Sequence, residues 1–347
     1  MDKRIIFAVA GAGKTTTIIN ELSEDKRVLI LTYTVANYSN LKSKILEKFN
    51  HHWPENICLM RYFSFLFSFC YKPLLADKIK AKGIIYEPNE NQYVKSDKQR
   101  YYISRNRYFY SNRLAYFLEK TDSCREIQER LTKYFDKLMI DEIQDISGRD
   151  FNFLDKLMTT PIEMLFVGDF HQHTYDTSRD GNVNTSLFKS YDLYKERFLK
   201  NGFICDEYSL VKSWRCGAES CEFIRENLGI YIESNYGKDL DAAVMRVDNT
   251  AEIEEILKND DIIKLHYQKA SQYGSTHKNW GEVKGEDSYY DICVLLNQTT
   301  EKKYQNNKLD ELAPATKSKL YVAITRARGN VYLVDEKVAI KLLENRW

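Results

Sequence analysis

The chain has almost no excess of charge of either sign, since 51 Lys and Arg residues stand against 50 Asp and Glu residues among 347. A net charge of +1 excludes a chain-wide basic surface, so any surface that attracts nucleic acid must be local. Long apolar runs are also missing, and no stretch approaches the length of a membrane span. We therefore expect no membrane partner, and the motifs must indicate the function.

The chain has seven cysteines, and no two of them form a Cys-x-x-Cys motif. An odd number without a pairing pattern predicts free thiols in a reducing, cytoplasmic compartment. Cys216 and Cys221 have too few histidines near them for a zinc site. The basic residues Lys3 and Arg4 precede an apolar stretch, as in a signal peptide, but this stretch is too short and Lys14 follows it.

A phosphate-binding loop is predicted near the start of the chain. An apolar run over residues 5–10 is typical of a buried parallel strand, and residues 16–22 are typical of a helix. The intervening glycines let backbone N–H groups turn toward phosphate oxygens, Lys14 can reach the β- and γ-phosphates, and Thr15 can hold Mg²⁺. The predicted nucleotide contacts are Ala10, Gly11, Ala12, Gly13, Lys14, Thr15 and Thr16.

Carboxylates follow a second apolar strand, over residues 137–140. Asp141 can hold Mg²⁺, and Glu142 can take a proton from an attacking water. A third strand, over residues 164–167, leads to Gln172, which is placed to sense a γ-phosphate or orient the water. Because ligands bind beyond the carboxyl ends of parallel strands, these groups are expected at one edge of a sheet.

Together these motifs resemble the superfamily 1 helicases of the UvrD/Rep/PcrA type. Asp141-Glu142-Ile143-Gln144-Asp145 is similar to the family's Asp-Glu-x-Gln-Asp signature, and the resemblance extends from residue 5 to residue 334. The other matching strings are Leu31-Thr32-Tyr33-Thr34, Gly168-Asp169-Phe170-His171-Gln172, Ser213-Trp214-Arg215-Cys216, Val283-Lys284-Gly285-Glu286 and Val322-Ala323-Ile324-Thr325-Arg326-Ala327.

The resemblance implies an ATP hydrolase that uses Mg²⁺ and in which Arg215 and Arg326 neutralise charge on the transferred phosphoryl group. It also implies that Glu286, or Asp287 one residue later, approaches the ribose. Arg328 is either a further contact or a solvated helix charge, and the sequence leaves both readings open.

The resemblance also implies contacts to single-stranded DNA. Tyr33 stands where the family places an aromatic residue against the strand. Lys284 and Gly285 stand where the family contacts the nucleic-acid backbone or couples it to the nucleotide. The family's tryptophan after the third motif is absent, so Tyr175 is expected to replace it in part. The family's adenine-reading segment is not found before residue 5, so modest base selectivity is expected.

The expected fold is α/β: two RecA-like parallel-sheet domains of the P-loop NTPase class. The first domain is expected over residues 1–209, with a small, mainly helical insertion at about 76–130, and the second over residues 210–347. Only 68 residues separate Arg215 from Lys284, which leaves no room for the family's large second inserted subdomain.

One segment of the insertion, residues 95–113, carries six basic residues against one acidic residue, interleaved with aromatic rings. Positive charge and flat rings suit single-stranded nucleic acid, and the alternative is an amphipathic helix that buries its rings under a solvated basic face. The nucleic-acid candidates here are Lys98, Arg100, Arg105 and Arg107.

The main hypothesis is an ATP-dependent translocase or helicase stimulated by single-stranded DNA. The resemblance implies 3′-to-5′ polarity on single-stranded or tailed duplex DNA, with weak unwinding by the chain alone. The alternative is a nucleotide-gated sensor or adaptor that controls a protein partner such as a nuclease or accessory factor.

Overall fold

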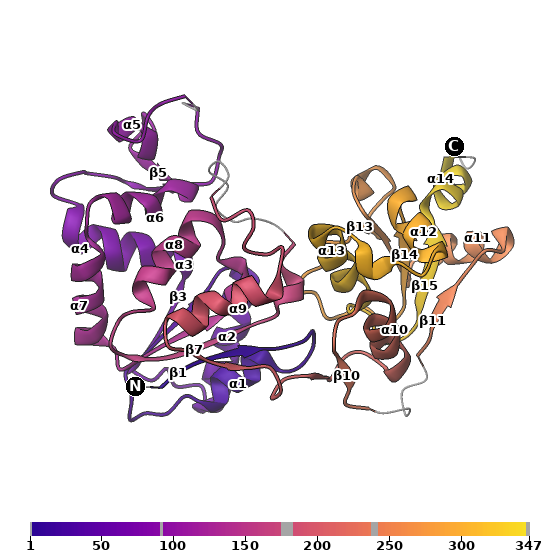
Figure 1. Ribbon diagram of the computed structural model, residues 1–347, viewed down its shortest axis with the longest axis horizontal. Helices are drawn as coiled ribbons and strands as arrows, with labels where there is room; N and C mark the ends of the chain where they lie inside the picture. Colours follow the sequence, from indigo (N-terminus) through magenta and orange to yellow (C-terminus); the bar gives the residue numbers. More distant parts are fainter. Residues whose placement is uncertain (1, 91–92, 175–182, 237–241, 345–347) are drawn as a thin grey trace. The chain divides into compact units, whose positions relative to one another are not determined.

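The computed structural model describes residues 2–90, 93–174, 183–236 and 242–344 (Figure 1). The chain divides into two compact units, and two short segments near the motif loops group with the second unit. Unit 1 comprises Met1–Phe7, Lys14–Gly168 and Asp176–Asp206, and unit 2 comprises Ala8–Gly13, Asp169–Tyr175 and Glu207–Trp347.

Unit 1 is built on a six-stranded, wholly parallel sheet in the order β3-β2-β6-β7-β1-β8. All five residues of β2 are buried, as expected for a parallel strand covered by helices on both faces. The strands are β1 Lys3–Phe7, β2 Val28–Thr32, β3 Ile57–Arg61, β6 Lys137–Asp141, β7 Glu163–Gly168 and β8 Ile204–Asp206.

The helices of unit 1 connect and cover these strands. α3 and α4 flank a π-helical segment, Phe65–Tyr71, so that residues 62–75 are helical throughout. Thr34 caps α2, where its hydroxyl accepts a hydrogen bond from the Asn37 amide at 3.1 Å. The helices are α1 Lys14–Asn20, α2 Val35–Lys48, α3 Tyr62–Ser64, α4 Lys72–Leu75, α5 Gln99–Tyr102, α6 Ser111–Lys120, α7 Cys124–Tyr134, α8 Gly148–Leu157 and α9 Tyr191–Lys200.

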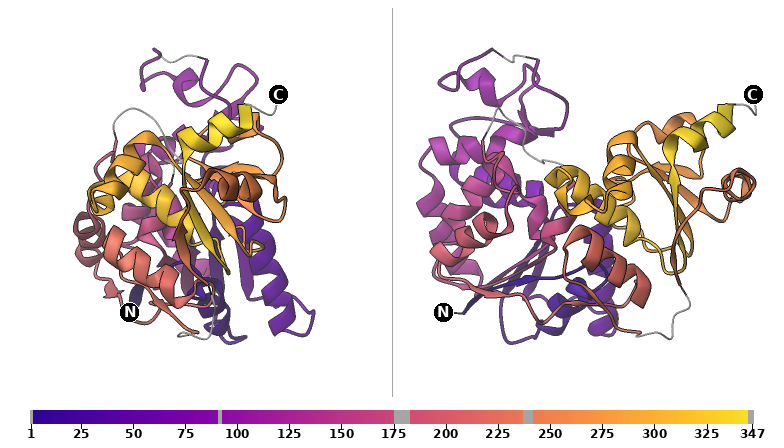
Figure 2. Two further views of the ribbon diagram at one scale, coloured as in Figure 1. Left: turned by 90° about the vertical axis from the view of Figure 1, so that its right-hand side faces the viewer. Right: turned by 45° about the vertical axis from the view of Figure 1, so that its right-hand side comes forward.

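Residues 76–130, where an insertion is expected, contain α5, α6 and most of α7, together with a two-stranded sheet that was not predicted. β4 Gly83–Ile85 and β5 Tyr108–Tyr110 form a two-stranded parallel sheet. Phe109 is fully buried in this pair, so packing of its ring favours the extended conformation. In Figures 1 and 2, the α5 region lies at the end of unit 1 opposite α1.

Unit 2 carries a five-stranded parallel sheet in the order β11-β15-β14-β12-β13 and a separate β9-β10 pair. The prediction of an α/β fold with two parallel-sheet units is therefore confirmed. The strands are β9 Lys212–Ser213, β10 Glu233–Ser234, β11 Val244–Arg246, β12 Ile263–His266, β13 His277–Asn279, β14 Ile292–Leu296 and β15 Val331–Asp335.

The helices of unit 2 include α11 and α14, which contact each other and contribute to one apolar core with β14 and β15. Cys293 and Leu295 of β14 and Val334 of β15 are fully buried in that core. The helices are α10 Ala218–Leu228, α11 Thr250–Lys258, α12 Gln298–Gln305, α13 Pro314–Ile324 and α14 Glu336–Glu344. No helix in the described ranges combines the length and apolar character needed to cross a bilayer.

Candidate active site

The chemistry-bearing residues of unit 1 lie at the carboxyl ends of neighbouring strands. β7 lies between β6 and β1, with Asp141 opposite Val167 and Phe7 opposite Gly168. In this register the carboxyl ends of β6, β7 and β1 lie together at one edge of the sheet. Open parallel sheets bind ligands beyond that edge, so the edge is the candidate site.

Lys14 and Glu142 form the centre of this edge. Lys14 is the first residue of α1 and its Nζ lies 3.4 Å from Glu142 Oε1, with both side chains largely buried. Glu142 also accepts a short hydrogen bond from the Gln144 amide. Its φ of 56° is left-handed, which is uncommon for a non-glycine residue and occurs preferentially at functional sites. The strand end thus holds a carboxylate against the lysine of the predicted phosphate loop.

Asp141, the last residue of β6, fits a cation ligand. It is 2% exposed, and its Oδ1 makes no hydrogen bond within the described part of the chain. Burial, followed by the charge of Glu142, raises the pKa of Asp141 to about 7, and Lys14 opposes that shift. A buried carboxylate oxygen without a donor is suited to Mg²⁺, and the half-buried Thr15 hydroxyl could supply a second oxygen.

The raised pKa of Asp141 leads to a stability prediction. Between about pH 4 and pH 7, Asp141 is ionised in the unfolded chain but protonated in the folded chain. The free energy of unfolding therefore falls as pH rises from about 4 to about 7. In metal-free buffer at pH 8, Asp141→Asn is expected to melt several degrees above the parent. At pH 4 to 5 that difference is expected to shrink. Thermal unfolding at both pH values checks this, and equal melting temperatures at pH 8 would contradict it.

The predicted phosphate loop, residues 8–13, makes close contacts within unit 2. Gly11 has φ of +72°, and an added Cβ would lie 2.8 Å from Ser213 Oγ and 2.9 Å from Arg215 Cβ. The Gly11 carbonyl accepts the Trp214 amide at 3.0 Å. Both the backbone angle and the crowding therefore require glycine at position 11.

A tyrosine that the sequence analysis missed joins two motif segments. The fully buried Tyr321 hydroxyl accepts the Ala10 amide at 2.9 Å and donates to Asp169 Oδ2 at 3.0 Å. Asp169 begins the turn that ends at Gln172, which is buried. Within that turn, burial and the charge of Lys317 lower the pKa of His171 to about 4. Tyr321 thus fixes the loop amide relative to the Gln172 turn.

Two arginines of unit 2 converge on one carboxylate. Arg215 donates to the Thr325 carbonyl at 3.1 Å and makes a short ion pair with Asp287 Oδ1. Arg326 Nη1 lies 3.8 Å from the same oxygen and 3.3 Å from the Glu286 carbonyl. Asp287 is 58% exposed on its side chain, so the arginine pair holds an anion at the surface of the unit.

The Glu286 carboxylate, predicted near the ribose, is engaged elsewhere in unit 2. Both of its oxygens accept from Lys278 Nζ, at 2.8 and 3.0 Å. The predicted nucleic-acid residue Lys284 is half-buried beside Gly285, whose φ is +86°. Tyr175 lies outside the described residues.

The aromatic candidate of unit 1, Tyr33, belongs to a ring cluster. It is half-buried, stacks on Tyr62 with centroids 6.1 Å apart, and meets Phe63 edge-on at 5.3 Å. Tyr86 packs edge-on against Phe63 at 5.4 Å and is 63% exposed. Sequence analysis missed Tyr86, since it lies 53 positions from Tyr33 and in no motif.

The 95–113 segment combines features of both alternatives, the surface for single-stranded nucleic acid and the helix with buried rings under a basic face. The rings of its aromatic residues are largely buried, so they are not presented to a strand of nucleic acid. The basic candidates are exposed. The segment is not one amphipathic helix, because the short α5 and the strand β5 occupy it. The buried rings are Tyr101, Tyr102, Phe109 and Tyr110, and the exposed cations are Lys95, Lys98, Arg100, Arg105 and Arg107.

Comparison with known proteins gives a family match over part of the chain. Residues 86–190 match the UvrD/REP helicase N-terminal domain. The exonuclease/helicase subunit RexA of Lactococcus lactis subsp. cremoris (strain MG1363) is 30% identical over 130 residues, which is 33% of this chain and 11% of RexA.

Solved structures share the fold. The Arterivirus nonstructural protein 10 helicase, both with DNA and alone, superposes with a TM-score of 0.50 at 13% identity over 99% of this chain. This chain covers 62% of the viral protein and about a tenth of RexA, so it spans less than two thirds of either. Within residues 86–190 the chain thus resembles the UvrD/REP helicase N-terminal domain, and its parallel-sheet fold is shared with the viral helicase.

Proposed function

We propose that the chain is an ATP-dependent translocase stimulated by single-stranded DNA, moving 3′ to 5′. One observation carries the proposal: Lys14 and Glu142 lie 3.4 Å apart beside the buried Asp141, at the carboxyl edge of a parallel sheet. A phosphate-loop lysine, a base and a metal-binding carboxylate are the groups that hydrolysis of a nucleoside triphosphate requires.

The proposed mechanism gives each residue one task. Lys14 binds the β- and γ-phosphates, and Glu142 accepts the proton of the attacking water, which Gln172 orients. Asp141 and Thr15 would hold Mg²⁺, which when bound supplies charge neutralisation at the phosphate oxygens. Arg215 and Arg326 stabilise the negative charge that develops on the transferred group.

Trp214 is proposed as the surface on which the base stacks. Its side chain is 59% exposed, its amide is bonded to the Gly11 carbonyl of the phosphate loop, and it precedes Arg215. Base–aromatic stacking contributes roughly 1–3 kcal/mol and tolerates every base, which agrees with the expected modest selectivity.

Removing this surface should therefore weaken nucleotide binding without regard to base. Trp214→Ala is expected to raise KM about 5- to 150-fold for ATP and GTP alike, whereas Trp214→Phe retains most of the affinity. Steady-state kinetics with both nucleotides measure this. A KM that rises for ATP and stays constant for GTP would mean that the indole reads adenine specifically.

Weak unwinding is proposed for the chain alone. The described residues between Arg215 and Lys284 form α10, α11 and strands of unit 2, so this stretch contributes to the sheet unit itself. Splitting a duplex costs roughly 1.4 kcal/mol per base-pair step and needs additional surface that grips the junction. A partner protein or self-assembly would supply that surface.

The experiment that tests the proposed function is displacement of streptavidin from biotinylated single-stranded oligonucleotides in the presence of ATP and Mg²⁺. A 3′-to-5′ translocase displaces streptavidin from the 5′ end faster than from the 3′ end. Equal spontaneous rates at both ends would contradict the proposal.

A second candidate function is a nucleotide-gated adaptor that controls a nuclease. The likeness to RexA, whose name describes an exonuclease/helicase subunit, favours it. An adaptor would hydrolyse ATP or change its partner affinity on binding ATP without displacing streptavidin from either end.

A further inference from the structure

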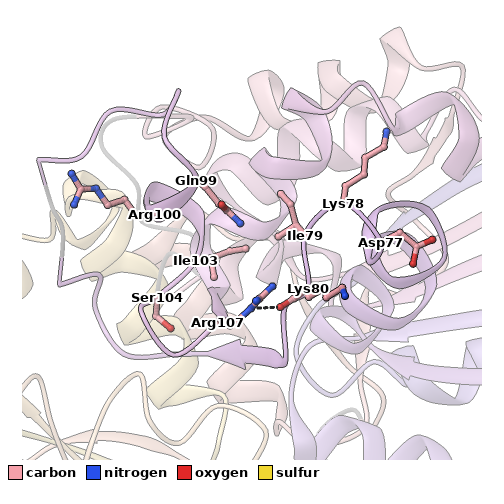
Figure 3. A pocket seen from close by; sticks show the side chains of 9 residues that line it. All are labelled: Asp77, Lys78, Ile79, Lys80, Gln99, Arg100, Ile103, Ser104 and Arg107. Atoms are coloured by element: carbon pink, nitrogen blue, oxygen red, sulfur yellow. Dashed lines mark hydrogen bonds between the residues drawn. The ribbon is translucent and has the colours of Figure 1, made fainter.

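A basic pocket in unit 1 lies outside the nucleotide site. It is an open hollow of about 510 Å³ between the segment that follows α4 and the segment that carries α5 (Figure 3). The pocket is lined by Asp77, Lys78, Ile79, Lys80, Gln99, Arg100, Ile103, Ser104 and Arg107.

The first wall of the pocket is anchored from the core. The hydroxyl of the fully buried Tyr71 donates a short hydrogen bond to the Ile79 carbonyl and accepts the Ala81 amide at 2.8 Å. These bonds hold the backbone from Ile79 to Ala81 in place. Lys78 and Lys80 therefore project from a fixed backbone.

The second wall is a tight turn. The Arg107 amide donates to the Ser104 carbonyl at 3.0 Å, and the Ser104 amide donates to the Tyr108 carbonyl at 2.8 Å. Arg107 has a φ of 67°, so its backbone takes the left-handed form that closes this turn. The turn places Ser104 and Arg107 at the rim of the same hollow.

Arg107 joins the two walls. The Arg107 Nε donates to the Lys80 carbonyl at 2.6 Å, drawn as the dashed line in Figure 3. The Arg107 carbonyl accepts a hydrogen bond from the Lys82 amide at 2.8 Å. The two Nη groups of Arg107 make no hydrogen bond to any residue that the structure describes. The guanidinium is thus held in position with donors remaining for a ligand.

The charge around the pocket is mainly positive, with four cations against one carboxylate. Lys78, Lys80, Arg100 and Arg107 form no ion pair with any described residue, although Asp77 also lines the hollow. Elsewhere in unit 1, the exposed Lys26 does form an ion pair, since its Nζ lies 2.7 Å from Glu163 Oε1. Four unpaired cations around one hollow form a site for an anion.

The geometry favours an extended anion over a single small ion. In Figure 3, Arg107 and Gln99 lie near the middle of the hollow, whereas Arg100 and Lys78 extend from opposite sides. No aromatic ring lines the pocket, and neighbouring rings such as Tyr101 and Tyr102 are buried. A ligand here meets charge and hydrogen-bond donors but no surface for base stacking.

We propose that this pocket binds the phosphate backbone of single-stranded nucleic acid without contacting its bases. The inference rests on the proposed nucleic-acid-dependent function and adds Lys78 and Lys80 to the interface. It also divides the four cations expected from sequence, since Arg100 and Arg107 line the pocket and Lys98 and Arg105 do not.

The test compares two triple variants across a salt series. The pocket variant is Lys78→Gln, Lys80→Gln and Arg100→Gln, which leaves the structural Arg107 intact. Its matched control is Lys95→Gln, Lys98→Gln and Arg105→Gln, three exposed cations of the same region that do not line the pocket. The affinity for fluorescent dT20 and for an abasic strand of equal length is measured between about 50 and 300 mM salt. Each phosphate contact contributes about 0.7 to the slope of log affinity against log salt concentration.

The pocket variant is expected to lose about 2 from the magnitude of that slope, equally for dT20 and the abasic strand. The control variant is expected to lose less than half as much. The proposal fails if the pocket variant keeps the parent slope, if its loss is confined to dT20, or if inorganic tripolyphosphate at equal phosphate concentration displaces the strand from the parent. If the parent binds no strand at all, the proposed function itself fails, which distinguishes the two.

Discussion

Arg326→Ala is expected to lower the ATP turnover rate by roughly 10³- to 10⁵-fold while ATP still binds. Arg326 and Arg215 approach the same Asp287 oxygen, which shows that the pair can hold one anion between them. In hydrolysis that anion would be the transferred phosphoryl group, whose charge grows in the transition state. Single-turnover hydrolysis with saturating ATP measures the chemical step directly.

The control for this prediction is Arg328→Ala. Arg328 is an exposed arginine two positions later whose Nε donates to the Asp287 carbonyl. Its loss should change turnover less than about tenfold. Because Arg326 is 2% exposed, Arg326→Lys serves as a second variant that keeps a buried cation without the planar fork. Parent turnover in a folded Arg326→Ala protein would exclude the arginine from catalysis.

Glu142→Gln is expected to slow hydrolysis by roughly 10²- to 10⁴-fold and to leave nucleotide binding intact. The amide keeps the size of the side chain and can still accept from Gln144, but it cannot take a proton from water. The ion pair with Lys14, at 3.4 Å, is lost in this variant, which leaves the Lys14 charge to the phosphates. Rapid-quench hydrolysis and fluorescent-nucleotide titration measure the two effects separately.

Glu163→Gln is the matched control for Glu142→Gln. Glu163 begins β7, at the opposite edge of the same sheet, and pairs with Lys26 at the surface. Its change should leave hydrolysis within about twofold of the parent. If Glu142→Gln hydrolyses ATP as fast as this control, another group acts as the base.

The elements around the phosphate loop could be predicted because their signals are local. An apolar strand, a turn with glycines at 11 and 13, and a helix beginning at Lys14 follow one another within 20 residues. The parallel sheets likewise follow from buried strands such as β2, which is apolar along most of its length. The small β4–β5 sheet was missed because two three-residue strands carry too little pattern.

Contacts between distant segments could not be predicted in this way. Tyr321 lies 311 positions from Ala10, and only the folded chain brings its hydroxyl to that amide. The composition of residues 95–113 is compatible with either exposed or buried aromatic rings. In the folded chain most of these rings are buried. The motif that contains Glu286 also gives no indication that this carboxylate pairs with Lys278, because Lys278 lies outside the motif.

DNA-stimulated translocation is tested by the steady-state rate of ATP hydrolysis by the purified chain in Mg²⁺, with and without single-stranded DNA. We expect a low basal rate that rises severalfold and saturably with DNA, and a rate in Glu142→Gln that is roughly 10²- to 10⁴-fold lower under both conditions. An unchanged rate across the DNA titration, or no hydrolysis above that of Glu142→Gln, would contradict a DNA-stimulated translocase.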